Sequence, residues 1–187
     1  WREYQLYIYI YAGDKMRAGN HFKNTADLSA AWYTGNTGIK PLDDAIKMAF
    51  GDGYIHHILR LMVVANLMNL YGIKPDSAYK WFMEFSLDSY DWVMIGNVYS
   101  MGMWADGGLS MRKPYISSSA YILKMSTYSR DKWCDEWDAL FYAFINRCSA
   151  QISKTYYAGL VKAWNRKPAA EKTRLLKLAK TALLRLT

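Results

Sequence analysis

Apolar residues recur with a period near 3.6 along most of the chain, which is the spacing of one helix face. The clearest case runs from Tyr54 to Tyr71, where aliphatic and methionine side chains fall on overlapping helical faces. We predict that this segment is the central buried helix. Gly72 ends it, and Pro75 predicts the first turn of a second helix that continues to about Leu87.

Further helices are expected on both sides of this pair. Thr25–Asp27 is predicted to open a short helix, and Pro41 to open another that ends at residues 51–53. Helical patterning returns over residues 120–124, 131–147, 150–164 and 168–186. Between Asn97 and Ser119 glycines, a proline and three serines break the pattern, so we expect a long irregular segment, which is often functional. Because no segment is typical of a strand, the sequence predicts one all-α domain over residues 1–187.

The composition is that of an ordinary globular chain with a high aromatic content. Of 187 residues, 52% are hydrophobic, 21% are charged and 16% are aromatic. Four prolines and two cysteines exclude a disordered tail and a disulfide scaffold, and two cysteines with three histidines form no recognisable zinc set. No run of 18 uninterrupted apolar residues exists, so we predict no membrane span. Cysteine usage fits a reducing, intracellular compartment without requiring one.

The net charge of +8 is concentrated at the C-terminal end. Residues 150–187 contain nine Lys or Arg and one acidic residue, Glu171, whereas the first 149 residues are neutral overall. A concentrated basic end favours an anionic partner such as nucleic acid. We therefore expect Lys172, Arg174 and Lys177 to contact DNA phosphates, and the alternative is a solvated helix face without such a partner.

Two adjacent histidines and an arginine stand at the start of the predicted central helix. Ionisable side chains in such an apolar segment are costly unless they are paired. His57 and Arg60 share a helical face, and Asp88 is the natural carboxylate partner of Arg60, which would form a buried pair. Such a pair is better evidence for a site than for stability. The alternative is that His56 and His57 cap the helix or fill a gap in the core.

The order of motifs along the chain resembles the C-terminal FAD-binding domain of the photolyase and cryptochrome superfamily. The similarity rests on residues 1–4 (Trp-Arg-Glu-Tyr), 32–38, 53–62, 90–93, 97–108 with Ala-Asp-Gly-Gly at its end, and 113–126. The nearest branch is the bacterial group of iron-sulfur cryptochromes and (6-4) photolyases. The resemblance implies an all-helical domain that holds FAD and faces damaged DNA, where light drives an electron from the flavin to a flipped-out lesion.

The resemblance also assigns roles to individual residues. His56 and His57 match the catalytic pair at the lesion, and Arg60 and Asp88 match the pair beside the isoalloxazine ring. The other matches are Met94 at flavin N5, Asp106, Gly107 and Gly108 in a loop that approaches the cofactor, and Trp81, Tyr33 and Tyr121 in the chain that carries electrons to the flavin.

Several positions depart from the family pattern. Met94 replaces a carboxylate or Asn, and because a thioether cannot relay a proton, the redox balance of the flavin should differ. Tyr33 replaces a Trp, and since tyrosine is harder to oxidise without losing its proton, photoreduction should be slower or need a proton acceptor. The cluster cysteines are replaced by Pro41, Ser129, Lys132 and Asp135, and one neighbouring thiolate, Cys134, cannot hold a [4Fe-4S] cluster, so we predict none.

Three functions stay open at this point. The chain is the FAD-binding domain of a flavoprotein that repairs UV-damaged DNA, a blue-light sensor without repair, or a non-catalytic helical module that binds protein partners in a larger complex. The histidine pair and Arg60 favour a flavoprotein, whereas Met94 and the missing cluster ligands favour the module. The α/β antenna domain of the family is absent from this sequence, which starts without Met, so we expect a fragment or processed product. If these 187 residues were the whole protein, the FAD pocket would be open or incomplete.

Overall fold

Helices make up nearly all the regular structure of the chain in the computed structural model, which describes residues 2–186. Trp1 of the Trp-Arg-Glu-Tyr motif lies outside these residues. The described part contains eleven α-helices and two π-helices, and its only β pairing is an isolated bridge between Ala26 and Ile73. The predicted all-α class is confirmed.

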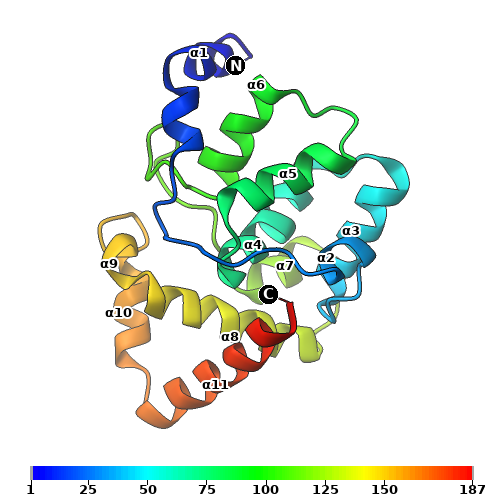
Figure 1. Cartoon of the computed structure of the whole chain (residues 1–187). Helices are drawn as coiled ribbons and strands as arrows, with labels where there is room; N and C mark the ends of the chain where they lie inside the picture. The colour runs from blue at the N-terminus through cyan, green and yellow to red at the C-terminus, as the bar shows by residue number, and fades with distance from the viewer. Residues whose placement is uncertain (1, 187) are drawn as a thin grey trace.

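Figure 1 shows the helices arranged from one end of the molecule to the other, with α2 to α5 and α7 in the middle. Their bounds are α1 (Arg2–Arg17), α2 (Ala31–Thr34), α3 (Lys40–Asp52), η1 (Leu59–Ala65), α4 (Asn66–Tyr71), α5 (Pro75–Phe85), α6 (Asp91–Met94), η2 (Ile95–Gly102), α7 (Ser119–Met125), α8 (Lys132–Arg147), α9 (Ser149–Ile152), α10 (Ala158–Arg166) and α11 (Ala169–Leu186). Helices α1 and α6 lie at one end, and α8 to α11 form the other. Within residues 2–186, no helix is both long and apolar enough to cross a membrane.

The predicted central helix is present, but it starts later and is wound differently. Helical structure begins at His57 rather than Tyr54, and it continues as the π-helix η1 before it becomes the α-helix α4. All six residues of α4 are buried, as expected for a helix that is apolar on every side. Gly72 ends it with a positive φ of 76°, a conformation that glycine adopts without strain.

The short helix predicted at Thr25–Asp27 is wrong, because this segment is extended. The Ala26 N–H donates to the carbonyl of Gly72, and the Ala26 carbonyl accepts from the N–H of Lys74. Asp27 accepts from Lys74 Nζ at 2.6 Å and from Ser77 Oγ at 2.8 Å. The carboxylate that was expected to start a local helix therefore binds the beginning of α5 instead.

Two other boundaries also differ from the prediction. Residues 97–102, expected to be irregular, belong to η2, so the irregular segment starts only at Met103. The helix predicted over residues 150–164 is divided into α9 and α10 by a turn at residues 153–157. The other predicted helices, α3, α5, α7, α8 and α11, begin and end within about two residues of the prediction, which is the usual ambiguity of helix ends, whereas the short helices α2 and α6 were not predicted.

Helix α1 was not predicted, and side chains from other helices hold it in place. Its middle consists of Tyr and Ile residues, which are types with a low helix propensity. Asp91 at the start of α6 accepts a hydrogen bond from Tyr9 Oη at 2.9 Å and another from Tyr79 Oη. Arg17 Nη2 donates to both carboxylate oxygens of Asp91, at 2.5 and 2.6 Å. Tertiary contacts therefore fix a helix that local propensity does not specify.

Candidate functional site

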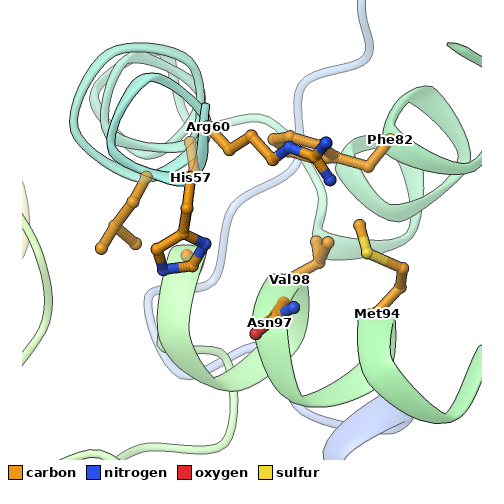
Figure 2. Close-up of a pocket in the computed structure, with 9 residues that line it drawn as sticks. His57, Arg60, Phe82, Met94, Asn97 and Val98 are labelled. Carbon is orange, nitrogen blue, oxygen red and sulfur yellow. The ribbon is translucent and has the colours of Figure 1, made fainter. Parts of the chain in front are cut away.

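The two π-helices form opposite walls of a pocket of about 310 Å³ (Figure 2). Its lining residues are His57, Arg60, Leu61 and Ala65 on one side, Met94, Asn97, Val98 and Gly102 on the other, and Phe82 from α5. A Cβ on Gly102 would lie 3.0 Å from the Cβ of Ala65, so the glycine permits the close approach of these walls. π-helical turns are rare in proteins, and those that occur are often found at functional sites.

Arg60 reaches from η1 across the pocket toward Phe82 (Figure 2). Its side chain is only 12% exposed, and its Nε donates to the carbonyl of Ile55 at 2.7 Å. The guanidinium also lies 5.1 Å from the ring centroid of Tyr54. Its Nη2 is buried and has no hydrogen-bond partner within the described part of the chain. A buried charged donor without an acceptor is costly, so this atom points to a ligand with an acceptor group.

Asp88 forms the predicted ion pair with Arg60, but only the Arg60 side chain of this pair is buried. Asp88 Oδ1 lies 2.9 Å from Arg60 Nη1, and the Asp88 side chain is 54% exposed. Burial opposes its ionisation, but hydrogen bonds from Ser86 and Arg60 and the charge of Arg60 outweigh that effect, so the pKa of Asp88 lies below its usual value. The pair fixes the guanidinium while Asp88 remains accessible at the surface.

The two histidines have different surroundings. His56 Nδ1 accepts from the N–H of Ile58 at 3.2 Å, and the His56 carbonyl accepts from the N–H of Arg60, so His56 caps the start of the helix. His57 lies at the rim of the pocket (Figure 2). Desolvation lowers the pKa of His57, and the charges of Arg60 and His56 lower it further, so its imidazole is neutral near pH 7.

His57 and Asn97 also line a second hollow of about 590 Å³ beside the pocket. Arg2 and Gln5 of α1 and Trp92 of α6 belong to its wall. His57 therefore stands between the pocket that contains Arg60 and a wider opening toward the surface. A neutral imidazole at such a position can exchange a proton with a group in either space.

An aromatic series leads from the pocket to the surface. Phe82 in the pocket wall is 5.0 Å from Trp81 between ring centroids, Trp81 is 5.6 Å from Phe50, and Phe50 is 5.8 Å from Tyr33. Tyr33 is 41% exposed. Burial raises the pKa of Tyr33, and so do the charge of Glu84 and its hydrogen bond to the phenol, which gives Tyr33 a carboxylate as proton acceptor. The structure thus brings two of the three predicted electron-transfer residues into one series.

Tyr121, the third predicted electron-transfer residue, lies apart from this series. It packs against a small cluster of Leu61, Met62 and Met101. Met94, by contrast, is buried in the pocket wall, and its position next to the flavin ring stays a prediction.

The loop of Asp106, Gly107 and Gly108 lies outside this pocket, and its approach to the cofactor stays a prediction. None of the three is among the described residues that line the pocket. A Cβ on Gly107 would lie 2.7 Å from His21 Nδ1, and the N–H of Gly108 donates to Asp106 Oδ1 at 3.0 Å. One buried oxygen of Asp106 has no partner among residues 2–186. The loop therefore surrounds His21 rather than Arg60.

The basic residues predicted to contact DNA lie on α11, at the opposite end of the molecule from α6 in Figure 1. Arg174 and Lys177 are exposed, whereas Lys172 Nζ donates to the carbonyl of Asn165 and lies 5.6 Å from the ring centroid of Trp164. They are therefore not adjacent to the pocket.

The positions that replace the cluster cysteines have other contacts. Asp135 lies 3.5 Å from Arg130, Pro41 is in the first turn of α3, and Cys134 is buried. In the described residues, no three His, Cys, Asp or Glu side chains converge as metal ligands would. The absence of an iron-sulfur cluster stays a prediction.

Comparison with known proteins agrees with this architecture. Residues 7–174 match the family described as the FAD binding domain of DNA photolyase, so the chain belongs to that family. It is 39% identical over 128 residues to a (6-4) photolyase of Agrobacterium fabrum, in a match that covers 68% of this chain and a quarter of that enzyme. It is also 62% identical over 85 residues to protein R855 of Acanthamoeba polyphaga mimivirus, which covers 45% of this chain and 69% of that protein.

Sequence reasoning missed three contributors to the site. Phe82 and Asn97 line the pocket, and Asp91 anchors the helix that forms the neighbouring hollow. Asn97 had been placed in an irregular segment, because glycines obscured the helical period of η2. Only the position of Phe82, next to Trp81, carried a usable signal.

Proposed function

We propose that this chain forms the flavin-facing part of a photolyase or cryptochrome type flavoprotein, with light-driven electron transfer for repair of UV-damaged DNA or for blue-light sensing. One observation carries the proposal: the buried, unpartnered Nη2 of Arg60 in the pocket between the π-helices. The membership of the chain in a FAD-binding family supports the same cofactor.

The lining residues of the pocket suit a flat ring system by their chemistry. The space between the walls is narrow, with room of about 20 Å³ for water-sized molecules, so the walls would have to move apart to admit such a ring. Leu61, Val98 and Met94 supply apolar surface, and Arg60 supplies a cationic donor for a ring heteroatom. These residues fit an isoalloxazine ring, and the rest of FAD would extend beyond this pocket.

The residues of this chain would then divide the work around the cofactor. FAD, when bound, supplies light absorption and one-electron chemistry. Arg60 would stabilise negative charge on the ring, and neutral His57 would hold or transfer a proton on the side of the wider hollow. Met94 has no proton to give, so it would only pack against the ring. Trp81 and Tyr33 would pass an electron inward, while Glu84 takes the phenolic proton of Tyr33.

Flavin uptake tests this proposal directly. The purified chain is titrated with FAD, and binding is measured by flavin absorption and fluorescence. Arg60→Met keeps an unbranched side chain but removes the charge, and we expect FAD affinity to fall roughly tenfold or more, since a hydrogen bond to a charged group is worth about 1.5–3 kcal/mol. Lys74→Met, which removes a paired cation away from the pocket, is the matched control. Failure of the unmodified chain to bind FAD would overturn the proposal.

A non-catalytic interaction subunit is the second candidate. The observation that favours it is the outer face of α1, where Tyr7, Ile10 and Tyr11 are exposed one helical turn apart. A helix face with this much exposed apolar surface fits a protein partner. Formation of a stable complex by a chain that does not bind FAD would support this candidate.

A further inference from the structure

A groove formed by α4, α8, α11 and the segment at Thr25 shares no lining residue with the pocket around Arg60 or with the hollow beside His57. Its volume is about 290 Å³, which is close to the lower limit of the ~300–1,000 Å³ that small-molecule sites occupy. Most of its described lining residues are apolar, and Arg147 is the only charged one among them. A space of this size suits a small molecule better than a helix, which is ~10 Å or more across.

The guanidinium of Arg147 is held in one position by contacts on several sides. Its Nη1 donates to Asn24 Oδ1 at 3.0 Å, and its Nη2 donates to the carbonyl of Asn69 at 3.2 Å. Both asparagines are buried, and the guanidinium carbon lies 5.4 Å from the ring centroid of Phe144. A Cβ on Gly72 would lie 3.4 Å from each Nη atom, so the guanidinium rests against this part of the backbone. The cation is therefore preorganised for a ligand in the groove.

Arg147 has no carboxylate partner, in contrast to several other arginines. Ion pairs with a carboxylate are formed by Arg17, Arg60, Arg130 and Arg185. In the part of the chain that the structure describes, no ion pair includes Arg147. Its hydrogen bonds to Asn24 and Asn69 use two of the five N–H groups of a guanidinium. The remaining donors can serve an acceptor outside this chain.

Two acidic residues adjoin lining residues of the groove, and both have partners already. Asp27 follows the lining residue Ala26 and accepts from Lys74 Nζ at 2.6 Å. Glu136 accepts from the hydroxyl of Tyr71 at 3.0 Å and forms an ion pair with Arg185. Their charges are therefore compensated elsewhere, and the positive charge in the groove is left to attract an anion.

We propose that this groove binds a small aromatic carboxylate, with the carboxylate on Arg147 and the ring against Ala143 and Leu183. A guanidinium of fixed orientation can bind a carboxylate through two parallel N–H bonds. Ala143 and Leu183 are the partly exposed apolar residues of the helices on either side, so they can cover the ring of such a ligand. The groove is independent of the proposed function, because the Arg60 pocket contributes no residue to it.

Isothermal titration calorimetry with 2-naphthoate tests the proposal, and 2-naphthamide is the uncharged ligand of the same shape. We expect one naphthoate per chain, bound roughly three- to tenfold more tightly than the amide, since solvent partly screens a charge pair in an open groove. Arg147→Met removes the charge and should abolish this preference. Arg174→Met removes an exposed arginine of α11 and should retain it, which makes it the matched control. Absence of naphthoate binding, or an unchanged preference in Arg147→Met, would overturn the proposal.

A second variant locates the ligand without removing a charge. Ala143→Phe places a ring in the groove, so we expect neither naphthoate nor the amide to bind. Unaltered binding to this variant would show that the ligand lies elsewhere and would overturn the proposal. Circular dichroism of each variant checks that the helices are intact, and the control variant shows what loss of an exposed arginine does by itself.

Two further titrations separate other sources of binding. The C-terminal carboxylate of a protein has the same chemistry, and an acetylated alanyl-alanyl-phenylalanine peptide represents it. Tighter binding of this peptide than of naphthoate would overturn the small molecule in favour of a protein terminus. FAD should bind without displacing naphthoate, and displacement would place naphthoate in the cofactor pocket and overturn a separate site. Naphthoate binding with no uptake of FAD would support the groove and count only against the proposed function.

Discussion

Replacing the carboxylate of Asp91 by an amide is expected to release α1 from the rest of the fold. Asp91 accepts hydrogen bonds from Tyr9, Arg17 and Tyr79, which come from α1 and α5. In Asp91→Asn, the amide nitrogen cannot accept these bonds, and the partner of Arg17 loses its charge. Since α1 carries Arg2 and Gln5 of the hollow beside His57, the same change disturbs the candidate site.

The magnitude follows from the exposure of the groups. The Arg17 and Asp91 side chains are 39% and 37% exposed, so solvent screening reduces their ion pair to about 0.5–1 kcal/mol. The hydrogen bond from Tyr79 to the carboxylate adds about 1 kcal/mol. We therefore expect Asp91→Asn to lower the free energy of unfolding by about 1.5–2 kcal/mol and Tm by roughly 3–8 °C. Asp14→Asn, an exposed position on the same helix, is the control.

The pH dependence of this effect provides the decisive result. Burial opposes ionisation of Asp91, but hydrogen bonds from Tyr79, Arg17 and Tyr9 and the charge of Arg17 outweigh it, so its pKa lies below the usual value. The stabilisation is therefore fully present above the unfolded pKa of about 3.9 and is lost as the pH falls through the lower folded value. Urea unfolding of both proteins should show their difference shrinking at acidic pH. A constant difference would refute an origin in the carboxylate charge.

Three further predictions concern the pocket. The pKa of His57 is lowered, so its contribution to the free energy of unfolding is present above about pH 6.5 and is lost as the pH falls through the folded pKa. His57→Gln should flatten this pH dependence in urea unfolding, and His56→Gln serves as the comparison. In FAD-loaded protein, Tyr33→Phe and Glu84→Gln should both slow the light-driven reduction of the flavin, followed by absorption; an unaffected rate in Tyr33→Phe would exclude it from the electron path. Gly102→Ala should cost about 1–3 kcal/mol of stability and weaken FAD binding, because its Cβ would press against η1; unchanged unfolding and affinity would show that the walls can separate freely.

Local patterns predicted the all-α class and the ion pair at the centre of the site. Arg60 and Asp88 could be paired because the first is a charge in an apolar helix and the second follows the next helix in sequence. The spacing of His57 and Arg60 on one face likewise placed both at the same pocket. These are contacts between neighbouring segments, for which periodicity and charge are sufficient.

Contacts between distant segments account for what the sequence did not show. The loop at Asp106 packs against His21, about eighty-five residues earlier, and no local pattern encodes that choice. Helix α1 contains Tyr and Ile residues of low helix propensity in its middle, and partners such as Asp91 stabilise its helical form. Asp27 was expected to start a local helix, but Lys74 and Ser77 take its carboxylate. In each case tertiary structure overrides a weak local preference.

The π-helical walls have a consequence for how the site tolerates insertions and deletions. The hydrogen bonds of a π-helix join residues i and i+5 rather than i and i+4, so one turn takes up an additional residue. Removal of one residue from η1 would let α-helical winding return there and change which side chains of that segment, Arg60 among them, face the pocket, whereas the buried α4 can keep its orientation. We therefore expect single deletions in η1 to affect the pocket more than the hydrophobic core.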